Sequence, residues 1–143
     1  GPSRTGEELA FAIQKAMNQA NVDPAHLDFI SSHGTATAYN DEMESKAFAI
    51  SGVSATPMNS FKGYFGHTLG AAGLIESALT IRSMKENLLI ACIGFREPGV
   101  PMPVNVIRTH TPARINAALK TVSGFGGCNT ALVFKKSTKD TGK

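Results

Sequence analysis

The sequence predicts an α/β fold, in which helices cover a mixed β-sheet. Helix-like and strand-like segments alternate along most of the 143 residues, and no internal repeat or low-complexity stretch interrupts them. Two further strand-like segments lie near the C-terminus, where a glycine-rich turn joins them. This order of elements is typical of helices packed on a sheet.

The first element is an amphipathic helix expected over residues 6–20. Thr5 and Glu8 have the spacing of a capping box, in which each side chain binds a free backbone N–H group at the helix start. Apolar residues then recur at helical spacing: Leu9, Ile13, Ala16, Met17 and Ala20. After a break at Asp23-Pro24, the short apolar segment 27–32 is typical of a buried strand.

The middle of the chain predicts two more helices around a short strand. One helix begins at Asn40-Asp41, with acidic residues in its first turn. A short strand is expected at 57–60. Residues 68–84 predict a long helix that is apolar on nearly every side, with Glu76 as the only charge in its first part. Such a helix is expected to be buried in the core.

The last third of the chain predicts two strands after an irregular segment. Residues 88–93 form a short apolar run, and residues 97–119 contain four prolines, which favours a long excursion with little regular structure. Strands are expected at 120–123 and 130–134. Together the elements predict an α/β fold in which helices cover a mixed sheet.

Length and composition fit a single buried globular domain over residues 1–143. Hydrophobic residues make up 42% of the chain and charged residues 17%, which excludes a disordered chain. The net charge of +3 has a simple source in the lysine-rich C-terminal end. No zinc-ligand spacing, basic stripe, transmembrane run or signal peptide is present, and two cysteines make no disulfide framework. We therefore expect a cytoplasmic protein that uses no metal or cofactor and binds neither nucleic acid nor membrane.

The first candidate site is the segment His33-Gly34-Thr35-Ala36-Thr37, directly after the first predicted strand. Ligands of open α/β sheets bind at the carboxyl ends of strands. An imidazole at that place can donate a hydrogen bond or move a proton near neutral pH. A histidine that only bonds the backbone at the strand end is the alternative, and His33 taken alone favours it.

The second candidate site combines Lys62 with His67. Lys62 follows a predicted strand, and His67 lies just before a helix N-terminus, where the helix dipole disfavours a protonated imidazole. A neutral His67 could donate to a developing oxyanion while Lys62 supplies positive charge. The alternative is an exposed lysine beside a histidine that caps the helix.

The third candidate site is the glycine loop Gly124-Phe125-Gly126-Gly127. Glycines around one bulky apolar side chain can form a hinge that gates an acyl channel. A tight turn whose Phe125 fills the core is the alternative, and the loop alone favours it. Glu76, in its apolar helix, needs a partner, and a structural carboxylate is the simpler interpretation.

Taken in order, these motifs resemble the C-terminal half of β-ketoacyl-acyl-carrier-protein synthases of the elongating type. The matching strings are HGTAT followed by Asn40, Asp41 and Glu44, then KGYFGHTLGAAG from Lys62 to Gly73, and then the glycine loop. The resemblance covers essentially the whole chain, and its second string is the most specific. It implies the C-terminal half of the thiolase fold, with helices on both faces of a five-stranded mixed sheet.

The resemblance also implies a chemistry. The family joins an acyl thioester to malonyl-acyl-carrier protein by decarboxylative Claisen condensation, in fatty acid, polyene or polyketide synthesis. By motif position, His33 and His67 match its two catalytic histidines and Lys62 its lysine. Phe125, on the glycine loop, matches the gating residue, and Glu76 a buried glutamate near the site. Thr35 and Thr37 fall beside His33 in the same motif. The implied partners are the acyl carrier protein and a second copy of the synthase in a homodimer.

The chain departs from the family pattern at the nucleophilic cysteine and around the glycine loop. No residue matches the nucleophilic cysteine, because neither Cys92 nor Cys128 has the required context. The N-terminal half that carries the nucleophile is therefore expected to be absent, and the isolated chain to be inactive. Val122-Ser123 and Cys128 also depart from the usual residues around the glycine loop, which concerns acyl-chain specificity. Two alternatives stay open: a domain of a cysteine-less chain-length partner, and a free-standing acyl-binding domain.

Overall fold

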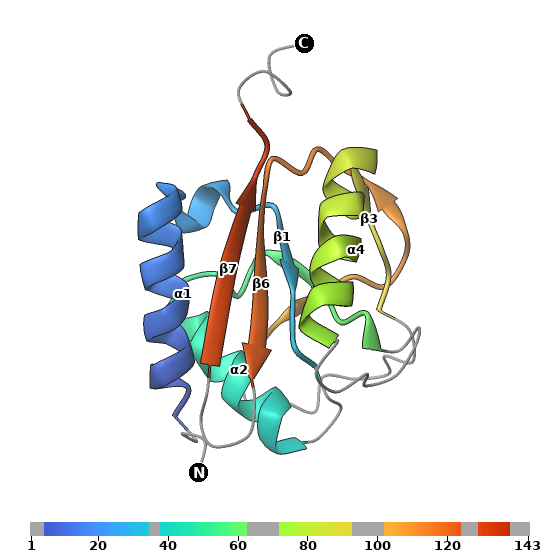
Figure 1. Ribbon diagram of the computed structural model, residues 1–143. Coiled ribbons are helices and arrows are strands. Elements are labelled where there is room, and N and C mark those ends of the chain that lie inside the picture. Colours follow the sequence, from blue (N-terminus) through green and yellow to red (C-terminus); the bar gives the residue numbers. More distant parts are fainter. Residues whose placement is uncertain (1–4, 35–37, 63–71, 93–101, 124–128, 138–143) are drawn as a thin grey trace.

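The computed structural model describes residues 5–34, 38–62, 72–92, 102–123 and 129–137 (Figure 1). The helices are α1 (Glu7–Ala20), the 3-10 helix η1 (Pro24–His26), α2 (Ala38–Ile50) and α4 (Ala72–Glu86). The strands are β1 (Phe29–Ser31), β2 (Pro57–Asn59), β3 (Leu88–Leu89), β4 (Asn105–Val106), β5 (Thr111–Pro112), β6 (Ala117–Ser123) and β7 (Asn129–Lys135). None of the described helices is long and apolar enough to cross a membrane.

The main sheet has five strands in the order β4-β2-β1-β6-β7. Strand β1 runs parallel to both β2 and β6, and β2 runs parallel to β4. Strand β7 pairs antiparallel with β6 along its whole length, so the sheet is mixed. The carboxyl ends of β1, β2 and β6 therefore lie at one edge of the sheet, where the polar segments that follow β1 and β2 meet.

Helices cover both faces of this sheet, which confirms the predicted α/β/α layers (Figure 1). Side chains alternate between the faces along each strand. Ile30 and Leu119 pack in one core cluster with residues of α1 and α2. Their neighbours Phe29 and Ala118 point to the other face and pack with Met84 of α4.

Helix α1 begins one residue later than the capping-box prediction places it. Its N-cap is Gly6, with φ +75°, and not Thr5, although the Thr5 hydroxyl oxygen accepts the Glu7 N–H at 3.4 Å. A Cβ at Gly6 would lie 2.7 Å from both the Ala47 nitrogen and the Met43 oxygen of α2. The close approach of α2 therefore requires glycine at the start of α1, and the contact between helices decides where α1 begins.

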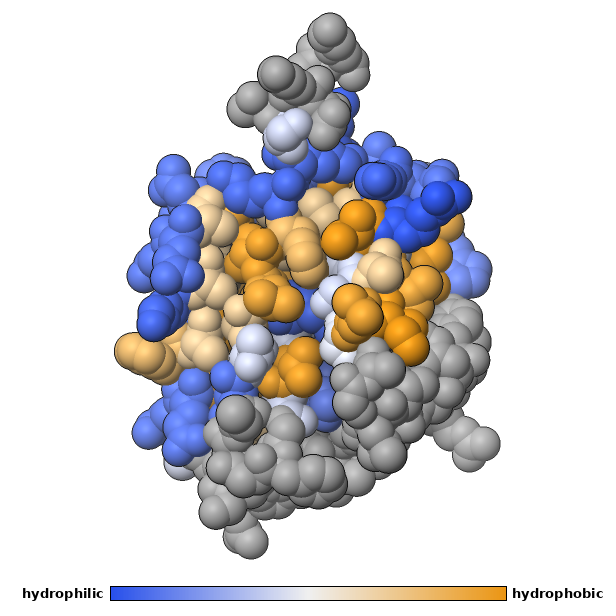
Figure 2. Space-filling view, in the orientation of Figure 1, coloured by the Kyte–Doolittle hydropathy of each residue, from blue (hydrophilic) through white to orange (hydrophobic). Residues whose placement is uncertain are grey.

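Helix α4 is not buried on all sides as its composition predicts. It turns polar side chains inward, because Glu76 and Thr80 are fully buried. Several of its apolar side chains point outward: Leu74 is 77% exposed, and Ile75 and Ile81 are also exposed, while Met84 packs in the core. Figure 2 shows apolar surface on this face of the molecule, over the region of α4 and the last strands. An apolar helix with an inward polar face indicates a surface made to be covered.

The prediction of an irregular excursion over 97–119 is wrong in part. Strand β4 lies in this segment and adds an edge to the main sheet, while β5 pairs with β3 in a separate two-stranded ladder. Strand β6 also begins three residues earlier than predicted, at Ala117. A strand of two residues is too short to show an alternation of apolar and polar residues in the sequence. Such strands are recognised only by their pairing with distant strands in the structure.

Candidate active site

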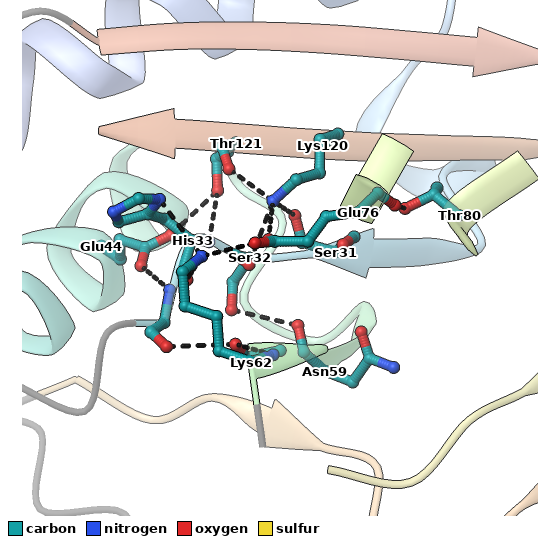
Figure 3. A network of polar contacts seen from close by, with 12 residues as sticks. Ser31, Ser32, His33, Glu44, Asn59, Lys62, Glu76, Thr80, Lys120 and Thr121 are labelled. Atoms are coloured by element: carbon teal, nitrogen blue, oxygen red, sulfur yellow. Dashed lines mark hydrogen bonds and ion pairs between the residues drawn. The ribbon is translucent and has the colours of Figure 1, made fainter. Parts of the chain in front are cut away.

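The candidate site lies where β1, β2 and β6 end (Figure 3). The Ser32 N–H donates to the Asn59 carbonyl at 2.8 Å, which carries the β1–β2 pairing one residue past β1. His33 follows directly and is 4% exposed. The chain after β2 brings Lys62 to the same place, and α4 contributes Glu76 from above the sheet.

Glu44 of α2 holds the backbone of His33 and Gly34. Its Oε2 accepts the His33 N–H at 3.0 Å, and its Oε1 accepts the Gly34 N–H at 2.8 Å. Thr121 of β6 also donates its hydroxyl to Glu44 Oε2, at 2.9 Å. Burial raises the pKa of Glu44, while these three donors act in the opposite direction by stabilising the ionised carboxylate. The histidine is therefore held by a buried acid as well as by its strand.

Gly34 allows the ends of β1 and β2 to approach closely. Its φ is +43°, and a Cβ there would lie 2.6 Å from the Ser60 Cβ. Ser60 donates its hydroxyl to the Gly34 carbonyl at 3.1 Å. This glycine therefore has a steric reason to follow His33.

Lys62 lies against the His33 imidazole. Its Nζ is 3.5 Å from His33 Nδ1 and also donates to the His33 carbonyl. An ammonium group offers only donors, so its position favours the lone pair on Nδ1 and the ring hydrogen on Nε2. In that tautomer His33 is a neutral imidazole with one N–H group to donate.

Glu76 joins Lys62 to a second lysine. Its Oε2 accepts from Lys62 Nζ at 2.7 Å, and its Oε1 accepts from Lys120 Nζ of β6 at 2.8 Å. Lys120 and Glu76 are both 0% exposed. Burial lowers the pKa of Lys120, and the nearby Glu76 carboxylate opposes this shift. The site thus holds an ion cluster of two cations around one anion, almost out of contact with water.

The structure brings together three of the residues singled out in the sequence: His33, Lys62 and Glu76. The other candidates lie outside the described residues: Thr35, Thr37, His67, Gly124, Phe125, Gly126, Gly127 and Cys128. Cys92 is described and half-buried, and its Sγ lies 3.9 Å from the Ser60 carbonyl. Within the part of the chain that the structure describes, no group of three or more His, Cys, Asp or Glu is placed to hold a metal ion.

Sequence reasoning missed Lys120 and Thr121. Lys120 lies in an otherwise apolar strand, and Glu76 is the only charged residue in the apolar first part of its helix. Each pattern indicates a buried charge that needs an oppositely charged partner. The two residues are 44 positions apart, and no local pattern pairs them. Their contact follows from the packing of α4 on β6.

Comparison with known proteins matches this architecture to a family. The family model for the β-ketoacyl synthase C-terminal domain matches residues 1–96. The chain belongs to this family. The 3-oxoacyl-[acyl-carrier-protein] synthase 2 of Vibrio harveyi is 32% identical over 141 residues, which cover 94% of this chain and 34% of that protein.

Solved structures agree with the family and with the C-terminal half of the thiolase fold. A β-ketoacyl synthase from Burkholderia phymatum superposes with a TM-score of 0.88 at 33% identity, covering 93% of this chain and 33% of the other. The ketosynthase of a type II polyketide synthase, solved with its acyl-carrier protein, superposes with a TM-score of 0.89 at 29% identity, covering 95% of this chain and 34% of the other. The chain thus spans about a third of the length of the relatives it matches.

Proposed function

We propose that this chain is the C-terminal half of an elongating β-ketoacyl-acyl-carrier-protein synthase and supplies the electrostatic part of its condensing site. The substrates are an acyl thioester and malonyl-acyl-carrier protein, in fatty acid or polyketide synthesis. Relatives from both kinds of pathway support this range. The nucleophilic cysteine belongs to the other half of the synthase, so the isolated chain is inactive.

The contact between Lys62 and His33 carries this proposal. When malonyl thioester loses carbon dioxide, the electron pair of the broken C–C bond passes to the thioester carbonyl and forms an enolate. A neutral His33, with its hydrogen on Nε2, donates to that developing oxyanion, and His67 is the second donor. The enolate carbon then attacks the enzyme-bound acyl group, and the cysteine thiolate leaves. Donors that are fixed in a dry site stabilise the charged transition state more than the neutral substrate.

The uncovered apolar face supports the view that a second half completes the site. Leu74, Ile75 and Ile81 of α4 are exposed, and so is Leu132 of β7. No described element covers them, and Figure 2 shows a broad apolar surface on this face of the molecule. Covering such a surface by the rest of the synthase would stabilise the whole protein by the hydrophobic effect. We place the complete enzyme in the cytoplasm as a homodimer that docks acyl carrier protein.

The test uses the whole synthase, made from the gene that encodes this chain. His33→Ala should lower malonyl-acyl-carrier-protein decarboxylation by about 100-fold or more, because one oxyanion donor is lost. His26→Ala is the matched control, since the His26 side chain is 77% exposed and lies before the amino end of β1, whereas His33 follows its carboxyl end. Unchanged decarboxylation in His33→Ala contradicts the proposal.

A second measurement separates the alternatives. The 143-residue chain, incubated with acyl thioester, should form no acyl-enzyme by mass spectrometry. Acylation at Cys92 or Cys128 contradicts the proposal. An upstream half without a cysteine at the start of a buried helix would assign the chain to a chain-length partner. A stable monomer that binds acyl chains, without binding a hydrophobic dye, would assign it to a free-standing binding domain.

A further inference from the structure

Lys120 is a buried cation for which neither the sequence motifs nor the proposed chemistry gives a role. Its Nζ donates to Glu76 Oε1 and the Thr121 carbonyl at 2.8 Å each, to the Ser32 carbonyl at 3.2 Å and to the Ser31 carbonyl at 3.4 Å. All four of these atoms are oxygen acceptors. A neutral amine would turn its lone pair toward them, whereas an ammonium group uses all three of its hydrogens. The surroundings therefore hold Lys120 as a cation, although burial lowers its pKa.

The charges around His33 come from every element packed at this edge of the sheet. Lys62 follows β2, Glu76 lies on α4, Lys120 on β6 and Glu44 on α2. Lys62, Glu76 and Lys120 form one ion cluster with a net charge of +1. Glu44, whose pKa is raised by burial, faces the backbone of His33 from the opposite side of the sheet. Without Lys120 the cluster would be neutral.

We propose that Lys120 is a positioning residue of this site, which fixes Glu76 beside Lys62 and keeps the His33 imidazole neutral by making the adjacent ion cluster net positive. A proton on His33 would add a second positive charge next to Lys62 and in reach of the field of Lys120. Because the cluster is almost free of water, this repulsion is weakly screened. Lys120 acts on His33 through Glu76 and through space, and it touches no substrate. The consequence for catalysis rests on the proposed function; the effect on His33 does not.

The expected effect is a shift in the titration of His33. For scale, two unit charges roughly 10 Å apart at an effective dielectric constant of about 20 interact by an energy equivalent to about one pKa unit. In Lys120→Met the cluster becomes neutral, so the pKa of the His33 imidazole should rise by about one unit. The double variant Lys120→Met/Glu76→Gln leaves only Lys62 and restores the net charge of +1. Its His33 should titrate near the wild-type pH again.

The double variant separates charge from structure. If Lys120 only packed the core, removing a second buried partner would disturb His33 further, not return it. Lys135→Met is the matched control, because it removes the same charge from an exposed position on the neighbouring strand β7. It should leave the His33 titration unchanged.

The experiment follows the imidazole signals of the 143-residue chain by NMR from about pH 5 to pH 9. A higher pKa of His33 in Lys120→Met that returns to the wild-type value in the double variant supports the proposal. An unchanged pKa in Lys120→Met, or a larger change in the double variant, overturns it.

If Lys120→Met does not fold, the NMR chemical shift of the Lys120 Nζ nitrogen in the wild-type chain tests the proposal instead, because it reports whether this amine is protonated. A protonated Lys120 throughout the titration of His33 supports the proposal, and a neutral amine at pH 7 overturns it.

The whole synthase gives an independent readout. Lys120→Met should move the acid limb of the decarboxylation pH profile upward by the same one unit, because His33 must be neutral to work as proposed. If Lys120→Met lowers the decarboxylation rate at every pH without shifting the acid limb, Lys120 has a structural role alone. If His33→Ala keeps full activity, the proposed function fails, while the NMR titration still tests the charge effect of Lys120.

Discussion

Replacing Glu76 by leucine should destabilise the fold far more than any surface charge change on α4. Glu76 is 0% exposed and pairs with Lys62 and Lys120 at 2.7 and 2.8 Å. Glu76→Leu leaves two buried ammonium groups without their anion. Removing one partner of a buried ion pair costs about 3–5 kcal/mol.

The loss from each stranded lysine has an upper bound, because that lysine can release its proton. From the ordinary lysine pKa of 10.5, deprotonation at pH 7 costs about 5 kcal/mol, at about 1.4 kcal/mol per pH unit. We therefore expect the free energy of unfolding at pH 7 to fall by about 3–5 kcal/mol. In Glu76→Leu the folded chain loses the Lys120 proton well below pH 10.5, while the unfolded chain keeps it. The free energy of unfolding then rises with pH, and the gap to the wild type narrows from pH 7 upward.

Urea unfolding followed by circular dichroism at pH 7, 8 and 9 measures this loss. Glu86→Leu is the matched control on the same helix, since Glu86 pairs with Arg82 at 3.0 Å but is 55% exposed, and it should cost less than about 1 kcal/mol. The triple variant Lys62→Met/Glu76→Leu/Lys120→Met, with no buried charge left, should recover most of the wild-type stability. Equal costs for Glu76→Leu and Glu86→Leu, or a triple variant as unstable as Glu76→Leu, would refute this reasoning.

Two further predictions concern Glu44 and the exposed face of α4. Because burial raises the pKa of Glu44 above 4.5, the folded chain keeps a proton that the unfolded chain releases. The free energy of unfolding should therefore fall as the pH rises above 4.5 toward the folded pKa, by at most about 1.4 kcal/mol per unit, and Glu44→Gln should abolish this fall. Urea midpoints of both proteins from about pH 4 to pH 7 measure it, and parallel curves contradict it. Leu74→Asn should change the stability of the chain by less than about 0.5 kcal/mol, whereas Leu9→Asn, in the core, should cost about 3 kcal/mol or more. Similar urea midpoints for the two variants contradict the assignment of Leu74 to an uncovered face.

Local patterns in the sequence determined the class of fold and the residues that could carry chemistry. The apolar spacing of Leu9, Ile13 and Met17 predicted α1, and the short apolar segment before His33 predicted β1, because each pattern reports the faces of one element. The order of the motifs along the chain is sufficient to single out His33 and Lys62 as candidates.

Only the tertiary structure decided which side of α4 is buried and which charged side chains form ion pairs. A helix that is apolar on nearly every side has no preferred inner face, so packing on the sheet decided that Glu76 and Thr80 are buried together with Met84. The same packing placed Glu76 between Lys62 and Lys120, which lie 14 and 44 positions away in the chain. Likewise, contact with α2 put Gly6 at the start of α1. The physical reason is common to all three: periodicity describes one segment, whereas burial and pairing depend on segments that are distant in sequence and close in space.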